Sequence, residues 1–171
     1  MNEPAYQAIT KLLDARSVSY VSITHEPCKT SEESEAARAK AGYPGVIGAK
    51  AILAKLYFKT NEQFATIVLP GTHVLDKDKL IAGIPELKKM RFATPEEMLK
   101  LADLVPGCMP PFAAPIFSNI PLLVIASAFK TLDKVGFNAA YLEKSILLSS
   151  KEYLSVVTPS FVIDCSIPKV S

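Results

Sequence analysis

Two lysines stand in an apolar run and are the first candidates for chemistry. The run GAKAILAKLYF covers residues 48–58 and contains Lys50 and Lys55. If the run forms a strand, its side chains alternate between two faces. Lys50 then shares a face with the larger apolar residues, whereas Lys55 shares the other with Tyr57 and Lys59, which indicates a solvated side. A buried ammonium requires a partner, a shifted pKa or a wet cavity, so Lys50 is the candidate functional lysine. The alternative is that its long stem reaches water.

A proline-dense loop is the second candidate. Residues 106–115 read PGCMPPFAAP. Proline fixes φ, and Pro110 and Pro111 have no N–H to donate, so the loop is expected to be rigid. Because Gly107 lacks a side chain, a ligand can approach its backbone closely. Such a loop can hold a backbone N–H toward a developing oxyanion. Composition alone favours a plainer interpretation, a chain reversal between a helix and a strand.

Histidine and cysteine offer less. His25 and His73 are 48 positions apart, which excludes a histidine-rich metal site. Cys28, Cys108 and Cys165 contain no CxxC pair, which argues against a disulfide framework or a zinc site and favours a reducing cytoplasm. We therefore expect neither a metal nor an organic cofactor. A Cys28–His25 pair stays open as a catalytic arrangement, although lone cysteines more often serve packing.

Length and composition indicate one globular domain over residues 1–171. The chain is 49% hydrophobic and 21% charged, its longest strongly apolar stretch is 122–129, and its start lacks the pattern of a secretory signal. No membrane association is expected. The net charge of +2 neither requires nor excludes a nucleic-acid partner. Lys88, Lys89 and Arg91 form the local basic cluster, for which a solvated edge is the plainer interpretation.

The elements that must position these residues are expected to be mixed. A capping box from Thr30 to Glu33 and the Thr94-Pro95-Glu96-Glu97 pattern each begin a helix. Two apolar runs around a polar turn predict a β-hairpin. Irregular interleaving favours an α+β domain with a mixed sheet. Helices are expected over 4–16, 30–40, 76–82, 94–103, 127–132 and from 150, and strands over 18–24, 48–58, 64–69, 87–92, 122–125, 145–148 and 161–164.

Several motifs, in order, resemble a known family. They are THEP, GAKAIL, VLPG, GCMPPF and GFNAAYLEKSILL, and over residues 5–165 the chain is similar to the YbaK/prolyl-tRNA-synthetase-associated domain. The resemblance implies a single α+β domain with a curved, barrel-like mixed sheet flanked by helices. It also implies an enzyme that hydrolyses wrongly charged aminoacyl-tRNA. The free-standing members that act on seryl- or threonyl-type errors are the most similar.

The resemblance also assigns residues. It implies that Lys50 is the essential lysine and that the GxxxP loop runs from Gly107 to Pro111. Ala113 and Ala140 stand where related sequences often have glycine, which bears on substrate identity. The pocket-lining regions that it implies include His25, Pro110, Pro111, Phe112, Phe137 and Asn138.

The expected function is trans-editing of mischarged tRNA that carries a small amino acid. Serine and threonine are favoured, and alanine, cysteine and proline are further candidates. Contact is expected at the acceptor end, with Lys88, Lys89 and Arg91 as candidates for phosphates, and a synthetase is a further candidate partner. Two alternatives stay open. One is a non-catalytic module that binds tRNA or a synthetase, and the other is a small-molecule esterase that uses Cys28 or Cys108.

Overall fold

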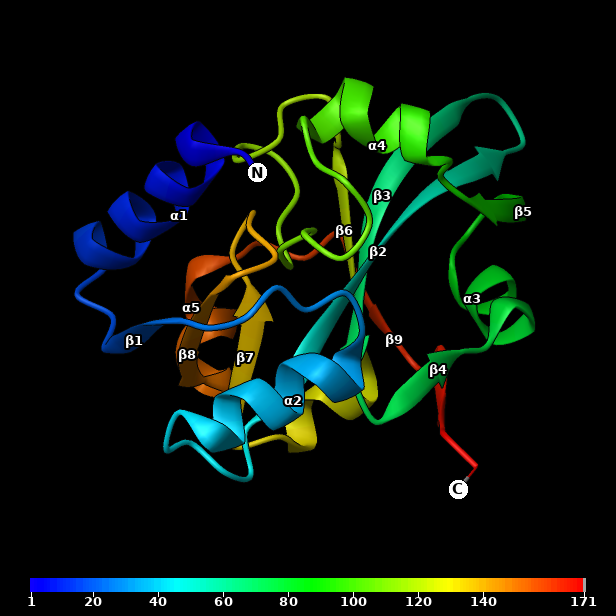
Figure 1. The fold of residues 1–171 in the computed structure, drawn as a ribbon. Helices are drawn as coiled ribbons and strands as arrows, with labels where there is room; N and C mark the ends of the chain where they lie inside the picture. The colour runs from blue at the N-terminus through cyan, green and yellow to red at the C-terminus, as the bar shows by residue number, and fades with distance from the viewer. Residues whose placement is uncertain (171) are drawn as a thin grey trace.

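The computed structural model describes residues 1–170, in which helices surround a mixed sheet (Figure 1). The predicted elements from the first helix to the last are all present with small shifts at their ends. The helices are α1 (Glu3–Ala15), α2 (Ser31–Lys40), α3 (Lys77–Gly83), α4 (Pro95–Ala102), the 3-10 helix η1 (Ser127–Thr131) and α5 (Ser150–Val156). The strands are β1 (Tyr20–Thr24), β2 (Ile47–Phe58), β3 (Glu62–Pro70), β4 (His73–Leu75), β5 (Leu87–Phe92), β6 (Leu122–Ala126), β7 (Lys134–Asn138), β8 (Lys144–Ser149), β9 (Phe161–Ile163) and β10 (Ser166–Pro168).

Strand β2 organises the large sheet. It pairs with β3 along nearly its whole length as the predicted hairpin, while its other edge pairs with β7 at its start and with β5 at its end. The strand order is β1-β8-β7-β2-β3-β6-β9, with parallel and antiparallel pairs. The predicted α+β domain with a mixed sheet is therefore confirmed. The sheet is open and not a closed barrel, because β1 and β9 do not pair with each other among the pairings of residues 1–170.

The helix starts follow the predicted local chemistry. The Thr30 hydroxyl accepts a hydrogen bond from the Glu33 N–H, and the Glu33 carboxylate accepts one from the Thr30 N–H, which completes the capping box of α2. Thr94 caps α4 in the same way through the N–H of Glu97. These caps fix where α2 and α4 begin, and the first turns of both helices border the cavity described below.

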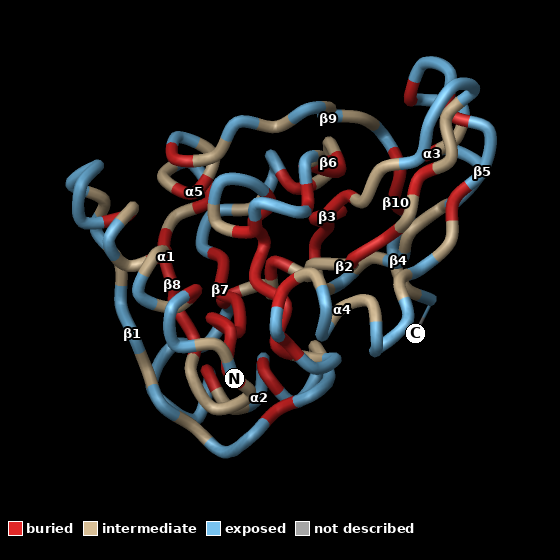
Figure 2. Tube along the Cα trace, turned by 90° about the horizontal axis from the view of Figure 1, so that it is seen from above, coloured by how far each residue is buried: buried red, intermediate tan, exposed pale blue. Residues whose placement is uncertain are grey.

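Both faces of β2 are covered along its inner half, which corrects one prediction. Ala49 and Leu53, on the face expected to be solvated, are buried in one hydrophobic cluster, whereas Ala54 and Leu56 on the opposite face belong to a second cluster. Figure 2 shows the buried residues running through the central strands. Alternation indicated the two faces correctly. It could not reveal that α1 and the proline-dense loop cover the face that carries Ala49 and Leu53.

A small ribbon formed by β4 and β10 was absent from the predicted elements. Ser166 pairs with Leu75 and Pro168 with His73. Each strand has only three residues and shows no alternation, so the sequence gives no local signal for either. The pairing brings the C-terminal segment beside the start of β2, since the Lys169 N–H donates to the Thr72 carbonyl at 2.9 Å.

Candidate active site

A cavity of about 700 Å³ lies between α2, the first half of β2, the end of β7, α4 and the proline-dense loop. This volume is typical of a pocket for a small molecule or for one end of a larger ligand. Lys50 and Gly107, the two residues predicted to carry the chemistry, both line it. Phe137 and Asn138 line it as well. The cavity therefore brings together four of the predicted residues from three separate segments.

Two glycines form the floor of this cavity. Gly48 of β2 and Gly136 of β7 are partners in a parallel pair, and both line the cavity. The Arg38 guanidinium lies against them, since a Cβ added to Gly136 would be 3.0 Å from its Nε and one added to Gly48 would be 3.6 Å from its Nη1. Glycine within a strand often marks such a close approach. The two glycines therefore make room for a large cationic side chain beneath α2.

Lys50 and Asn138 follow two residues after the paired glycines, so they project from the same face of the sheet. The Asn138 Nδ2 group donates to the carbonyl of Gly107 at 2.9 Å and to that of Cys28 at 3.1 Å. Asn138 thereby ties the proline-dense loop to the segment before α2. Lys50 projects from this sheet, and Asn138 holds the Gly107 loop against it.

Gly107 cannot be replaced without strain. Its φ is +96°, and a Cβ would lie 3.1 Å from the Lys29 Cα and 3.0 Å from a methyl carbon of Leu142. The Cys108 N–H donates to the Val105 carbonyl, whereas the Gly107 N–H has no hydrogen-bond acceptor within residues 1–170. Gly107 lines the cavity, and a backbone N–H without an acceptor in the protein is available to a developing negative charge on a ligand.

The cavity carries an excess of positive charge. Burial lowers the pKa of Lys50, and the neighbouring Lys169 lowers it further, while Glu32 acts in the opposite direction. Glu32 itself forms an ion pair with Lys169 at 2.8 Å at the cavity wall. Burial also lowers the pKa of Arg38 to about 10, so this side chain stays charged at neutral pH. Electron-rich groups of a ligand are favoured by this environment.

The other predicted pocket residues lie behind the cavity wall. Pro110, Pro111 and Phe112 are buried and are not among the lining residues. The Phe112 ring packs against Phe137, and its carbonyl accepts a hydrogen bond from the Thr66 hydroxyl at 2.8 Å. These contacts anchor the loop that carries Gly107.

His25 also lies outside the lining. Its Nε2 is 2.7 Å from the Ser145 hydroxyl oxygen, which in turn accepts from Arg38 Nε at 3.2 Å. The Ser145 hydroxyl also lies 3.3 Å from Asn138 Oδ1. His25 is therefore connected to the cavity through one hydroxyl that contacts two of the lining residues.

The cysteines do not form a nucleophilic site. Cys28 and Cys108 are 4% and 1% exposed, and neither lines the cavity. Burial raises the pKa of both thiols, so neither is a thiolate at neutral pH. The Cys28 Sγ lies 3.1 Å from the Glu26 carbonyl oxygen and 3.7 Å from His25 Nδ1. This environment is typical of packing cysteines and argues against the esterase alternative.

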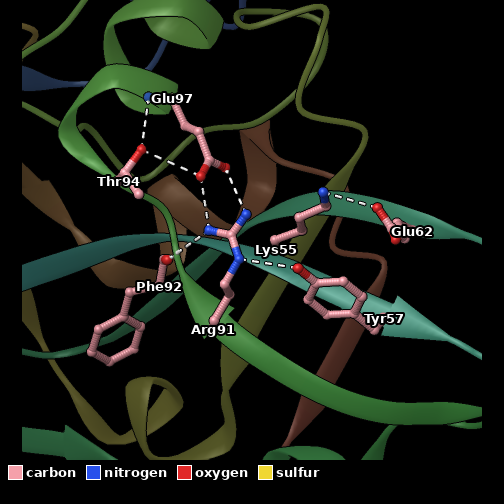
Figure 3. Close-up of polar contacts among 7 residues, drawn as sticks. All are labelled: Lys55, Tyr57, Glu62, Arg91, Phe92, Thr94 and Glu97. Atoms are coloured by element: carbon pink, nitrogen blue, oxygen red, sulfur yellow. Dashed lines mark hydrogen bonds and ion pairs between the residues drawn. The ribbon is translucent and has the colours of Figure 1, made fainter.

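The predicted phosphate-binding residues lie on the outer surface of β5, away from the cavity lining. Figure 3 shows Arg91 bound to both carboxylate oxygens of Glu97, at 2.8 and 3.3 Å, and to the Tyr57 hydroxyl at 3.0 Å. The Lys89 ammonium lies 4.5 Å from the centre of the Tyr57 ring, and Lys88 is exposed. Arg91 is therefore neutralised, whereas the two lysines remain accessible.

Sequence reasoning missed four charged residues of the cavity, Lys29, Glu32, Arg38 and Lys169. Arg38 stands in an alanine-rich, polar helix, where an arginine normally faces solvent. The glycines at 48 and 136, both inside strands, were the available signal for a bulky group above the sheet. Lys169 reaches the cavity through the ribbon of β4 and β10, which had no local signal.

Neither of the alanines that depart from the family pattern lines the cavity. Ala140 has a φ of +65°, in the left-handed region that glycine adopts more readily. Ala113 is buried in the proline-dense loop. The two departures therefore affect a turn and a loop interior.

Two further features bear on the class of protein. No helix within residues 1–170 has the length and apolar character needed to cross a membrane. In the same range, no group of three or more histidine, cysteine or acidic side chains is arranged to hold a metal ion.

Comparisons with known proteins identify the family and show related folds. Residues 25–156 match the model of the aminoacyl-tRNA editing domain. The chain is 27% identical over 157 residues to the Multifunctional Ser/Thr-tRNA deacylase ProXp-y of Escherichia coli strain K12, covering 92% of this chain and 90% of the relative. Among solved structures, it shares its fold with hypothetical protein APE2540 (TM-score 0.72, 20% identity, 93% and 99% of the two chains). A candidate trans-editing enzyme for prolyl tRNA synthetase also has this fold (TM-score 0.66, 17% identity, 98% and 99% of the two chains). Since the family model spans most of the chain, including Lys50, Gly107 and Asn138, the protein belongs to the aminoacyl-tRNA editing domain family.

Proposed function

We propose that the protein is a trans-editing deacylase that hydrolyses tRNA mischarged with a small amino acid, with serine and threonine as the favoured substrates. The observation that carries this proposal is that Lys50 and Gly107 line the same cavity. Family membership and the Ser/Thr-tRNA deacylase among the relatives support the reaction and the substrate class. The proposal treats residues 1–171 as one editing domain that acts in the cytoplasm.

In the proposed mechanism, water attacks the carbonyl carbon of the aminoacyl ester. The Lys50 ammonium and the Gly107 N–H stabilise the tetrahedral oxyanion that forms. The carbon–oxygen bond to the ribose then breaks, and the ribose oxygen takes the proton that the attacking water loses, with the vicinal ribose hydroxyl as the relay. Aminoacyl esters are already labile, so positioning and charge stabilisation supply enough acceleration without a further nucleophile.

Size selection in this proposal comes from the apolar wall of the cavity. Phe137, Met98 and Met109 line it beside the polar groups. A pocket that must hold the terminal ribose as well as the acyl group leaves room for a small side chain, and rigid walls reject large ones strongly. We expect contact with tRNA to be limited to its acceptor end, with Lys88 and Lys89 near phosphates and Arg91 held by Glu97. A synthetase that presents the tRNA is a further proposed partner.

A panel of charged tRNAs tests the proposal. Seryl-, threonyl-, alanyl-, cysteinyl- and prolyl-tRNA are incubated with the protein, and release of the amino acid is measured beside phenylalanyl- and leucyl-tRNA. We expect hydrolysis of small esters only. Binding of charged tRNA without release would favour the non-catalytic module, and comparable hydrolysis of the large esters would contradict the exclusion argument.

A further inference from the structure

Arg38 is a buried cation that the proposed mechanism does not use. It is 2% exposed, it lines the cavity, and it stays charged at neutral pH. It extends from α2 over Gly48 and Gly136, so its guanidinium lies at the floor, above the glycine that precedes Lys50 by two residues on the same face of β2. A buried arginine is costly unless it meets hydrogen-bond acceptors.

The protein supplies only part of those acceptors. Guanidinium has five N–H donors. Nε donates to the Ser145 hydroxyl at 3.2 Å, and Nη2 lies 3.5 Å from Asn138 Oδ1. Arg38 forms no ion pair with a carboxylate in residues 1–170. Its Nη1 has no hydrogen-bond partner in that range, although every fully buried side-chain nitrogen or oxygen there has one. Nη1 must therefore face an opening, and the opening that Arg38 lines is the cavity.

The parts of the ligand differ in how well they fit this position. The α-ammonium of an aminoacyl ester is repelled by Arg38 and Lys50, so it is favoured on the side of the exposed Glu32 carboxylate. A phosphate is large and strongly hydrated, and it is better accommodated beside Lys29 and Lys169, which line the wall and are less buried than Arg38. A small uncharged oxygen acceptor fits the floor, because the hydrogen bonds of Arg38 to Ser145 and Asn138 leave its Nη1 group free to donate.

We propose that Arg38 is a specificity-determining residue that donates to the side-chain hydroxyl of the acyl group. This inference rests on the proposed function and deepens it, since it explains how the cavity prefers seryl and threonyl esters to alanyl and valyl esters of similar shape. A site built to donate to a hydroxyl rejects an analogue that lacks it, because its own donor is then left without a partner.

The wild-type protein provides the first measurement. We expect kcat/KM for seryl-tRNA to exceed that for alanyl-tRNA, and kcat/KM for threonyl-tRNA to exceed that for valyl-tRNA, each by roughly 10- to 100-fold, as a hydrogen bond from a charged donor implies. The same tRNA body is used within each pair, so that contacts outside the acyl group cancel. Ratios near one would overturn the inference while leaving the deacylase function intact, whereas no hydrolysis of any ester would overturn the function itself.

The variants Arg38→Met and Arg38→Lys provide the second measurement, with the exposed Arg16→Met as the matched control. Arg38→Met should lower both ratios to near one, Arg38→Lys should lower them partly, and Arg16→Met should keep the wild-type ratios. An equal loss for all four esters would overturn the inference in favour of phosphate or ester binding. Thermal unfolding is measured in parallel. Arg38→Met should unfold cooperatively near the wild-type temperature, because it removes a buried charge that has no carboxylate partner in residues 1–170. Loss of the fold would overturn the assignment by showing that the guanidinium is structural.

Discussion

Strand β2 has one lysine in each of two cationic regions, and the two regions differ in how far the protein pairs or buries the positive charge. At the inner end, Lys50 lies in the cavity with Arg38 and Lys169, and its pKa is lowered by burial. At the outer end, Lys55 forms an ion pair with Glu62 at 2.8 Å, which raises the pKa of Lys55 (Figure 3). The number of cations is similar in the two regions. What distinguishes the candidate active site is that its cations without a carboxylate partner, Lys50 and Arg38, are wholly or partly buried.

The cations of the outer region can be accounted for by exposure and by contacts within the protein, without a ligand. Arg91 is bound by Glu97, and the ammonium groups of Lys55 and Lys89 lie over the Tyr57 ring at 5.4 and 4.5 Å. Exposed pairs of this kind contribute little to stability, because solvent screens them. The inner region has no such explanation, because burying cations together is unfavourable unless a ligand or transition state compensates for it.

The largest expected effect separates the two lysines of β2. Lys50→Ala should lower kcat/KM for seryl-tRNA deacylation by roughly 100- to 1,000-fold, as does the loss of one oxyanion donor. Lys55→Ala, the matched control on the same strand, should retain wild-type activity, since it removes only a surface ion pair. Single-turnover release of the amino acid measures both. Full activity of Lys50→Ala would remove the distinction between the two regions and the mechanism with it.

The Gly107 corner provides the next test. In Gly107→Ala, the φ of +96° costs about 1–2 kcal/mol, and the new methyl must also displace the Lys29 backbone. We expect kcat/KM to fall by up to about 100-fold, because a shift of the amide misaligns the oxyanion donor. Gly45→Ala is the control, since its φ is +80° but nothing lies within 4 Å of the added Cβ. Gly45→Ala should lose similar stability and keep its activity. If both variants lost activity equally, strain and not donor position would be the cause.

These two tests address residues that the sequence could identify, because the signals for Lys50 and Gly107 lie within a few residues of each. Lys50 could be placed because the two-residue period of a strand assigns each side chain to a face, and the hairpin is defined by adjacent apolar runs. The glycine at 107 was recognisable because prolines follow it directly and because its loop resembles that of a known family. The fold class followed in the same way, from caps and periodicities that act within a few residues.

The rest of the site depends on pairings distant in sequence. Arg38 is buried only because Gly48 and Gly136, nearly 90 residues apart, become partners beneath it. Lys169 reaches Glu32 only because β10 pairs with β4, and neither strand has the alternating polar and apolar residues that would predict it. Pro110, Pro111 and Phe112 show the converse, since the family resemblance implied that they line the pocket and tertiary packing placed them in the core. Local patterns therefore indicated which residues could react, and long-range packing decided which charges surround them.

The smallest expected effect concerns how those surrounding charges act on Lys50. Burial and the charge of Lys169 lower the pKa of Lys50, and the mechanism requires its ammonium form, so deacylation should decline as the pH rises through this lowered pKa. Lys169→Ala removes a like charge and releases Glu32 from its ion pair, and both changes favour the ammonium. The alkaline limb of the pH–rate profile, corrected for spontaneous ester hydrolysis, should therefore move to higher pH in Lys169→Ala and to lower pH in Glu32→Gln. The exposed Lys11→Ala should leave the limb in place. A limb that none of these variants moves would mean that another group titrates there, and that the positive charge gathered in the cavity does not act through Lys50.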